Sequence, residues 1–361
     1  MMRRRRALRA MVAAAAAIAA GRAALDTGEA RAQAASVERI GLLLPKSQGP
    51  LARASAALRA GVEAAYKREG RGFAVDLYEV DDSAQQLAAA YRGMLERGTA
   101  LAIGPLTRVG ATSLLQLGDV PITTLALNQI EGDAALPWNV ITLSLAVETE
   151  ARQIAVEAMR SLDQAALRGA PARAIIIGSA TPIGKRAAAM FYETWRSLGG
   201  EAPLPIELEL AGLYKFRAAI KRETGHLFFL AMDTDLARLV RPIIGNAVPA
   251  FGTSLLSSGG VSAAPIPELT GVRFVEMPGI LSSQYAQRIG YEAVPVDFSL
   301  EMLRLYCLGV DAIRVTRAFF SGHAKFDFDG LSGRLSYDGS SSRIERLPAL
   351  ASYRDGIPVP E

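Results

Sequence analysis

The chain has 361 residues, and its composition, 50% hydrophobic and 21% charged, is that of a folded protein rather than a disordered one. This length predicts two domains of ordinary size. The formal net charge of +4 comes from residues 1–34, which hold seven arginines against two carboxylates, and the remainder is almost neutral. We therefore expect no nucleic-acid partner.

The first 34 residues have the pattern of a cleaved export signal. An arginine-rich start precedes an apolar run at 10–20, which is too short to span a membrane as a helix of about 20 residues. An A-x-A cleavage site ends at Ala34, although cleavage after Ala23 also fits, and the pair Arg5-Arg6 leaves both Sec and twin-arginine export open. Either route predicts a location in the periplasm of a Gram-negative cell.

Cys307 is the only cysteine of the sequence. A single cysteine excludes an internal disulfide and a multi-cysteine metal site. Because it lies far from the cleavage site, we expect no lipid anchor. No later stretch has the pattern of a membrane span, so the exported protein is expected to have none.

From Val37 onward, short apolar segments alternate with segments of helical periodicity, which is the pattern of a parallel α/β sheet. In chain order, strands are expected at 39–44, 73–80, 100–103, 121–127, 174–178, 204–210, 226–230 and 272–277. Helices are expected at 51–68, from Ser83 to 97, from about 148, at 182–198, from Asp233 to about 242, and at 298–320. The dipeptide Asp338-Gly339 predicts a hairpin between strands at 334–337 and 343–350.

The same strand–helix rhythm in two successive stretches, 38–145 and 146–270, predicts two like lobes that form a clamshell. Each lobe is expected to be a parallel-sheet sandwich, joined to the other by crossover strands. We predict that the first lobe comprises 36–145 with 275–328. The second is predicted to comprise 146–274 with 329–361.

The sequence contains few of the residues and motifs that form catalytic sites. Only two histidines exist, His226 and His323, so a Ser-His-Asp triad or a histidine-rich metal site is not expected. No G-x-G-x-x-G follows the first strand, and no Walker A motif is present. The pair Asp81-Asp82 is better explained as a helix cap than as a metal site. We therefore expect no catalytic residue, no metal and no cofactor.

Polar residues follow several of the predicted strands, at the edge where open α/β sheets bind ligands. Such residues are also ordinary helix caps, so the group indicates a ligand cleft more strongly than any member does. Trp138, which follows Pro137, is a further candidate for the wall of a cleft. The predicted ligand-contacting residues are Ser47, Gln48, Thr107, Asn128, Thr181 and Asp233.

Several segments, taken in order, resemble one known family. They are RIGLLLP at 39–45, IGPL at 103–106, TLALN at 124–128, GVRFVEMP at 271–278, RLYCLGVDA at 304–312, GLSGRL at 330–335 and RIER at 343–346. Together they resemble the penicillin-binding-protein activator family (LpoA/LppC), and the resemblance covers nearly the whole exported chain. It implies a type I periplasmic-binding-protein fold.

The resemblance also implies a non-enzymatic regulator that docks on a bifunctional peptidoglycan synthase, a penicillin-binding protein. Members of the family carry a lipidated cysteine near the N-terminus, and the best-known ones carry a helical-repeat domain before the bilobed part. This sequence shows neither. An alternative interpretation is a periplasmic solute-binding protein for a small polar ligand, an amino acid or a cell-wall fragment, which serves an ABC transporter or a sensor. Both interpretations fit the residues, and the resemblance favours the first.

Overall fold

The computed structural model describes residues 37–361 apart from 71, 133, 163–166, 168, 209–211, 261, 262, 292–294, 296 and 297. The predicted export signal at 1–34 lies outside these described residues. The chain forms two compact units. Unit 1 consists of the chain up to Leu145 together with Val294–Arg346, and unit 2 of Ala146–Ala293 together with Leu347–Glu361.

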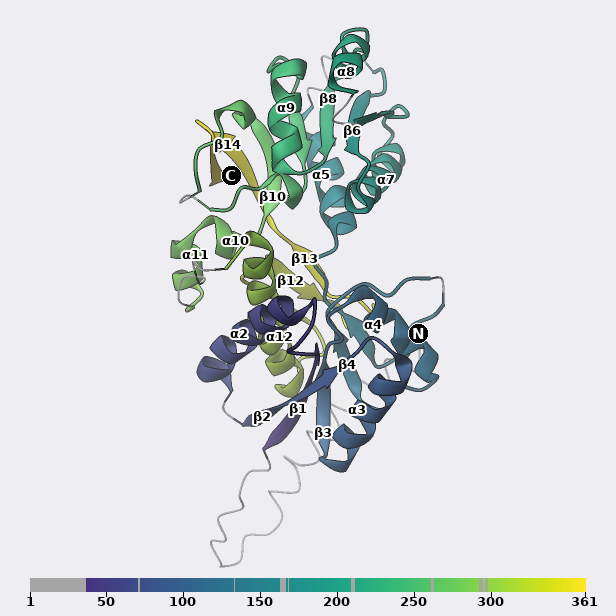
Figure 1. Cartoon of the computed structure of the whole chain (residues 1–361), viewed down its shortest axis with the longest axis vertical. Helices are drawn as coiled ribbons and strands as arrows, with labels where there is room; N and C mark the ends of the chain where they lie inside the picture. The colour runs from purple at the N-terminus through teal and green to yellow at the C-terminus, as the bar shows by residue number, and fades with distance from the viewer. Residues whose placement is uncertain are drawn as a thin grey trace, which may run out of the picture. The chain divides into compact units, whose positions relative to one another are not determined.

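Unit 1 contains a parallel sheet with helices on it and a small second sheet (Figure 1). Its strands are β1 (Glu38–Pro45), β2 (Phe73–Val80), β3 (Thr99–Ile103), β4 (Thr123–Ala126), β5 (Val140–Thr142), β11 (Phe326–Asp329), β12 (Arg334–Tyr337) and β13 (Glu345–Leu347), the last of which ends at the first residue of unit 2. Its helices are α2 (Ala52–Glu69), α3 (Ala84–Glu96), α4 (Arg108–Ser113), the short 3₁₀ helix η1 (Leu114–Leu117) and α12 (Leu300–Phe320).

The larger sheet of unit 1 has the strand order β2-β1-β3-β4-β5, and every pair in it is parallel. The inner strand β1 is buried from Ile40 to Leu44, because a parallel sheet is covered on both faces and its inner strands are apolar throughout. Leu87, Tyr91 and Met94 of α3 pack on one face. The predicted α/β class with parallel sheets is confirmed.

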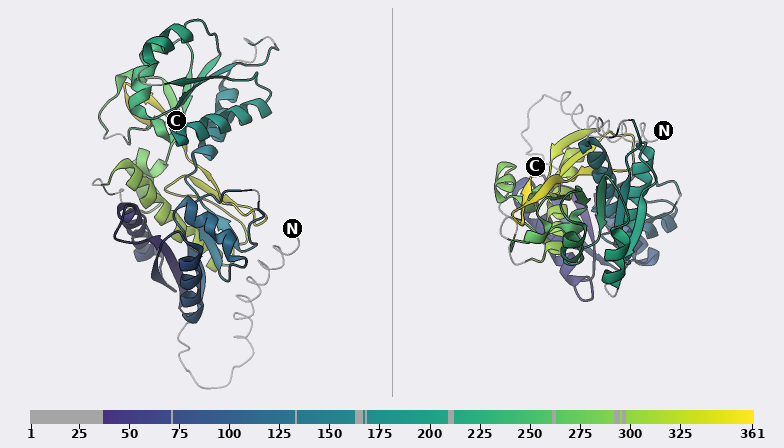
Figure 2. Two further views of the ribbon diagram at one scale, coloured as in Figure 1. Left: turned by 45° about the vertical axis from the view of Figure 1, so that its right-hand side comes forward. Right: turned by 90° about the horizontal axis from the view of Figure 1, so that it is seen from above.

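Helices α2 and α12 lie side by side in unit 1 (Figures 1 and 2). Two glycines allow this close approach. A Cβ atom added to Gly61 would overlap the carbonyl oxygen of Tyr306, and one added to Gly309 would overlap that of Leu58. Cys307 lies in the same part of α12 and is fully buried, as a structural cysteine is expected to be.

A buried carboxylate fastens α12 to the turn between β11 and β12. Asp311 has 0% exposure, and its two oxygens accept the N–H of Leu331 at 2.9 Å, the N–H of Ser332 at 2.8 Å and the hydroxyl of Ser332 at 2.6 Å. Gly330 leaves room for it, because a Cβ there would overlap the carboxylate. The GLSG motif at 330–333 is therefore a carboxylate-binding turn.

The side chain of Arg346 joins this turn to the segment that follows strand β5. Its Nη1 donates to the carbonyl of Ser332 at 3.0 Å, and its Nε donates to the carbonyl of Ser144 at 3.2 Å. Thr142 and Ile344 add a backbone hydrogen bond of 2.9 Å between the same two stretches. The end of unit 1 that precedes Ala146 and the end that precedes Leu347 are thus bonded to each other.

Unit 2 is built around a longer sheet. Its strands are β6 (Ala174–Ser179), β7 (Leu204–Leu208), β8 (Leu227–Ala231), β9 (Ala250–Gly252), β10 (Val272–Glu276), β14 (Ala349–Arg354) and β15 (Ile357–Pro360). Its helices are α5 (Val147–Ser161), α7 (Pro182–Ser197), α8 (Leu213–Ile220), α9 (Thr234–Ile244), α10 (Pro278–Leu281) and α11 (Ser283–Arg288), with the 3₁₀ helices η3 (Ser254–Leu256) and η4 (Pro267–Leu269).

The sheet of unit 2 has the order β15-β14-β10-β9-β8-β6-β7, parallel from β7 to β10 and antiparallel at β14 and β15. One buried cluster joins it to α8 and α9, and another joins it to α5 and α7. In the second cluster Phe191 stacks on Phe229, with ring centroids 4.1 Å apart, and on Trp195 at 5.7 Å. Trp195 is fully buried, so it packs the core.

The divisions of the chain differ in part from the predicted lobes. The first division falls between Leu145 and Ala146, but the return to unit 1 lies after Ala293 rather than at 275. The reason is that β10 pairs with β9 and β14 and so belongs to the sheet of unit 2. The last division lies after Arg346 rather than at 329, because β11 pairs with β12 inside unit 1.

The predicted strand at 343–350 is wrong as a single element. The structure breaks it into β13 and β14, which belong to different sheets. Pro348 lies between them and cannot donate a backbone hydrogen bond to either ladder. Strand β12 occupies the predicted range 334–337, and the turn at Asp338 follows it as expected.

Candidate functional site

The loops after β3 and β4 in unit 1 carry two of the predicted residues. Thr107 is the N-cap of α4: its hydroxyl accepts the N–H of Gly110 at 2.9 Å and donates to Oδ1 of Asp82 at 2.5 Å. The side-chain amide of Asn128 donates to the carbonyl of Leu106 at 3.0 Å. The two predicted residues therefore fasten neighbouring loops to each other, and their polar atoms are engaged within the protein.

The loop after β1 carries two more predicted residues, Ser47 and Gln48, and both are exposed. The backbone N–H of Ser47 donates to Oε1 of Glu79, at the end of the adjacent strand β2, at 2.9 Å. Hydrogen bonds from Ser47 lower the pKa of Glu79 below its ordinary value. This loop is thus tied to the sheet edge through Ser47, and both Ser47 and Gln48 remain exposed.

In unit 2 the structure brings Thr181 and Asp233 to one cavity of about 370 Å³. The cavity lies at the carboxyl ends of β6, β7 and β8, the edge where ligands of such sheets bind. Ser179, Leu208 and Leu236 also line it. Hydroxyl and carboxylate groups beside leucines suit a small ligand that has an apolar part and an amino or hydroxyl group.

Both of these predicted residues also cap helices. The hydroxyl of Thr181 accepts the N–H of Gly184 at 3.2 Å and lies 2.8 Å from the hydroxyl of Ser179. One carboxylate oxygen of Asp233 accepts the N–H of Leu236 at 2.9 Å. Each side chain therefore helps to begin α7 or α9 while it faces the cavity.

The predicted set divides between the two units: Ser47, Gln48, Thr107 and Asn128 belong to unit 1, and Thr181 and Asp233 to unit 2. Sequence reasoning missed Ser179, Asp235 and the lining leucines of the cavity. The positions of two of these residues could have indicated that they line a site, since Ser179 is the last residue of β6 and Asp235 lies in the first turn of α9.

Trp138 does not lie at the ligand-binding edge of its sheet, so its prediction as a cleft residue is wrong. Thr124 of β4 pairs with Val140 of β5, which places residue 138 beyond the amino ends of these strands. The amide of Asn139 confirms this position by donating to the carbonyl of Val120, before β4 begins. Ligands bind such sheets at the opposite edge.

The remaining polar candidates have structural roles. His226 accepts the backbone N–H of Arg173 on Nδ1 at 2.9 Å. Asp81 accepts the N–H of Ser83 at 3.0 Å, and hydrogen bonds from Ser83 lower the pKa of that carboxyl group. Over the described part of the chain, no cluster of three or more His, Cys, Asp or Glu side chains could hold a metal ion. None of the helices described there has the length and apolar character needed to cross a membrane.

Each unit is a largely parallel sheet with helices packed on it, and solved structures place this fold in the class of type I periplasmic-binding-protein-like α/β proteins. One is a "putative branched-chain amino acid ABC transporter" from Chromobacterium violaceum, with a TM-score of 0.71 and 29% identity over 87% of this chain and 99% of that chain. Another is the LpoA C-domain of Haemophilus influenzae, "a regulator of PBP1A", with a TM-score of 0.68 and 21% identity over 90% of this chain and 100% of that chain.

The family described as "LppC putative lipoprotein" matches residues 15–208 and 206–356, and the chain belongs to this family. Among curated relatives, the penicillin-binding protein activator LpoA of Edwardsiella piscicida is 24% identical over 329 residues, and that of Pantoea ananatis is 23% identical over 328 residues. Both alignments cover 78% of this chain but only 45% and 47% of the relatives. The chain thus spans a little under half of their length. The predicted family resemblance is confirmed.

Proposed function

We propose that this protein is a non-enzymatic periplasmic regulator of peptidoglycan synthesis, which binds a bifunctional peptidoglycan synthase and stimulates it. The observation that carries the proposal is the extent of the match. The family covers residues 15–208 and 206–356, and the fold aligns with the whole of a C-domain described as a regulator of PBP1A.

The polar groups at the sheet edges support a role without catalysis. A general base or nucleophile needs a reactive atom that is free to meet a substrate. The hydroxyl of Thr107 is held between Gly110 and Asp82, and the amide of Asn128 is bonded to Leu106. These contacts stabilise loops, and an outer surface of the protein is the part that we expect to meet the synthase.

The proposal is tested with the full chain, expressed with its leader in a Gram-negative host and recovered from the periplasm. Surface plasmon resonance against a bifunctional synthase of the same organism measures binding, and the rates of glycan polymerisation and peptide crosslinking measure stimulation. We expect saturable binding and a rise in at least one rate. A protein that is folded by circular dichroism but neither binds nor stimulates the synthase would refute the proposal.

A second function is favoured by one specific observation, the cavity that Thr181 and Asp233 line in unit 2. Its two helix caps and its leucines suit an amino acid or a cell-wall fragment, and the protein from Chromobacterium violaceum described as a putative branched-chain amino acid ABC transporter is similar in fold. In this case the protein delivers a solute to an ABC transporter or a sensor.

Native mass spectrometry of the protein from its own periplasm tests the second function. A small-molecule adduct at one-to-one stoichiometry that is lost in Thr181→Ala and Asp233→Asn would support it. An adduct that survives both substitutions, or protein that binds none of the amino acids added in a thermal-shift titration, would contradict it. Synthase binding is measured on the same samples, so the two functions are judged independently.

A further inference from the structure

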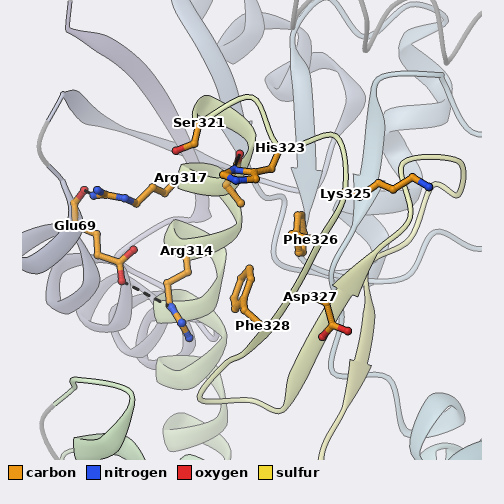
Figure 3. A pocket seen from close by; sticks show the side chains of 10 residues that line it. Glu69, Arg314, Arg317, Ser321, His323, Lys325, Phe326, Asp327 and Phe328 are labelled. Atoms are coloured by element: carbon orange, nitrogen blue, oxygen red, sulfur yellow. Dashed lines mark hydrogen bonds and ion pairs between the residues drawn. The ribbon is translucent and has the colours of Figure 1, made fainter.

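A groove in unit 1 runs between the carboxyl-terminal part of α12 and strand β11 (Figure 3). Its volume is about 430 Å³. The lining residues that bear on its chemistry are Arg317, Ser321, His323, Lys325, Phe326 and Phe328. The groove lies outside every set of residues that the sequence predicted to bind a ligand, and the proposed functions do not use it.

The groove carries an excess of positive charge. Its two carboxylates are already paired: Oε1 of Glu69 lies 3.8 Å from Nε of Arg314, and Asp327 accepts two hydrogen bonds from Arg334 at 2.6 and 2.8 Å. Arg317 donates from Nη1 to the backbone carbonyl of Glu69. Within the described residues, neither Arg317 nor Lys325 forms an ion pair with a carboxylate, and the charge of Lys325 acts on the nearby carboxyl group of Asp338, whose pKa it helps to lower.

One side of the groove is the open edge of a strand. The second sheet of unit 1 has the order β11-β12-β13, so β11 is paired on one side only among the described strands. Nη1 of Arg314, on α12, donates to the carbonyl of Asp329, which therefore points toward the groove. Alternate residues of an antiparallel pair share this direction, so the backbone N–H and carbonyl of Asp327 face the groove as well.

Aromatic rings supply apolar surface beside these groups. Phe328 lies under the guanidinium of Arg314, with 4.7 Å between the cation and the ring centroid. Phe326 packs edge-on against Phe319 at 5.6 Å and remains partly exposed. Figure 3 shows both β11 rings between the charged residues of α12 and Lys325.

We propose that this groove binds an extended acidic segment of a partner protein, which adds to β11 as a further strand. The open backbone edge selects a polypeptide, because strand addition uses main-chain hydrogen bonds. Carboxylates of the segment pair with Arg317 and Lys325, and its apolar side chains rest on Phe326 and Phe328. The inference goes beyond the proposed function and holds for whichever protein carries the segment.

Fluorescence anisotropy of the full chain with a labelled peptide of alternating glutamate and valine tests the proposal. A lysine–valine peptide reverses the charge, and a glutamate–proline peptide keeps the charge but cannot pair as a strand. We expect only the glutamate–valine peptide to bind. The double variant Arg317→Gln/Lys325→Gln should weaken its binding about tenfold, since it removes both exposed ion pairs with the glutamates of the peptide.

The matched control is Lys215→Gln/Lys221→Gln, which removes two exposed positive charges from unit 2 and should leave the affinity unchanged. Equal weakening in both double variants, or no binding of the glutamate–valine peptide to the wild type, would overturn the proposal. So would phosphatidylglycerol vesicles or oligodeoxythymidine that bind through Arg317 and Lys325 when the peptide does not. If the double variant fails to fold, Lys325→Glu replaces it, because no hydrogen bond of the Lys325 side chain occurs in the described structure.

Discussion

Asp311 stands in the middle of α12 with both carboxylate oxygens buried, and three donors of the 330–333 turn point at them. Burial raises the pKa of this carboxyl group, whereas the donors from Ser332 and Leu331 and the nearby guanidinium of Arg314 oppose the rise. We expect the ionised form, because a protonated oxygen would meet a donor instead of an acceptor. One side chain thus holds a helix and a turn together.

The substitution Asp311→Asn tests this arrangement at constant side-chain volume. The new amide N–H₂ must face a backbone N–H, so a buried donor loses its acceptor. We expect a loss of about 2–3 kcal/mol in the free energy of unfolding, measured by urea denaturation. The isosteric control Asp119→Asn lies on the surface and should change it by less than about 0.5 kcal/mol. Equal stability of the two variants would contradict the role of Asp311.

The lowered pKa of Asp338 predicts how the stability of the fold changes in acid. Hydrogen bonds from the hydroxyl of Ser340 and the backbone of Ser340 and Ser341 lower its pKa to about 2 from an ordinary 3.8. A carboxyl group whose pKa is lower in the folded state stabilises the fold above its unfolded pKa, and this contribution disappears as the pH falls through the folded pKa.

The stability advantage of the wild type over Asp338→Asn should therefore be full above about pH 4 and shrink toward about pH 2. Urea denaturation of both proteins across this range measures it. Because Asp338 is exposed, the effect is small. A difference that grows on acidification would show that the assigned direction of the pKa shift is wrong.

Single residues also show how far the sequence predicts a site. Thr181 and Asp233 lie at the starts of helices that the sequence predicts, and both are N-caps in the structure, because a cap needs only a local pattern. Which cap faces a cavity depends on neighbouring strands. Leu208 completes the cavity beside Thr181 from β7, a separate strand of the same sheet, and nothing in the sequence near Thr181 indicates that.

Among the elements, the contact between α2 and α12 depends on glycine. Gly61→Ala places a methyl group on the carbonyl of Tyr306, so the helices must separate. We expect a loss of at least about 2 kcal/mol in the free energy of unfolding. Chemical denaturation measures the change.

Gly93 in α3 is the matched control, since an added Cβ would meet only the ring of Tyr78 at an ordinary 3.6 Å. Gly93→Ala should stabilise the protein by about 0.5–1 kcal/mol, because alanine is the better helix former. If both substitutions change the free energy of unfolding in the same direction, packing at Gly61 is not as tight as the structure indicates.

Element type followed from the sequence where the pattern was long. Strand β1 and helix α12 were predicted within two residues of their observed ends, because a continuous apolar run and a long helical period are each distinctive. Strand β11, which reads Phe-Asp-Phe-Asp, and the three-residue strands β5 and β9 were missed or merged with loops. Such short strands depend on pairing with distant residues, which local pattern does not contain.

On the scale of the whole molecule, the proposed regulator should not depend on the predicted cleft residues. The triple substitution Thr107→Ala/Asn128→Ala/Thr181→Ala removes two helix caps and a loop fastening, so the melting temperature should fall. Binding to the synthase, measured by surface plasmon resonance, should remain unchanged. Loss of synthase binding in a folded triple variant would contradict this prediction and would place the docking surface at these loops.

The chain passes from unit 1 to unit 2, back to unit 1 and again to unit 2, and this order limits how well the sequence predicts the boundaries of the units. Local pattern places the first division after residue 145, between the end of β5 at Thr142 and the start of α5 at Val147. It does not place the later ones, because β10 and β11 are assigned to a unit only by their partner strands, which are β9 and β14 for β10 and β12 for β11. No short segment of sequence determines which distant strand it pairs with.

That chain order has a consequence for biosynthesis. The sheet of unit 2 begins with β6 but receives β14 and β15 from Leu347–Glu361, and unit 1 receives α12 from Val294–Arg346. A ribosome therefore releases most of the polypeptide before either unit can close its core. Unit 2 stays open to chaperones and to proteases until residues 347–361 emerge, so a stop codon just before Leu347 would leave its sheet without β14 and β15.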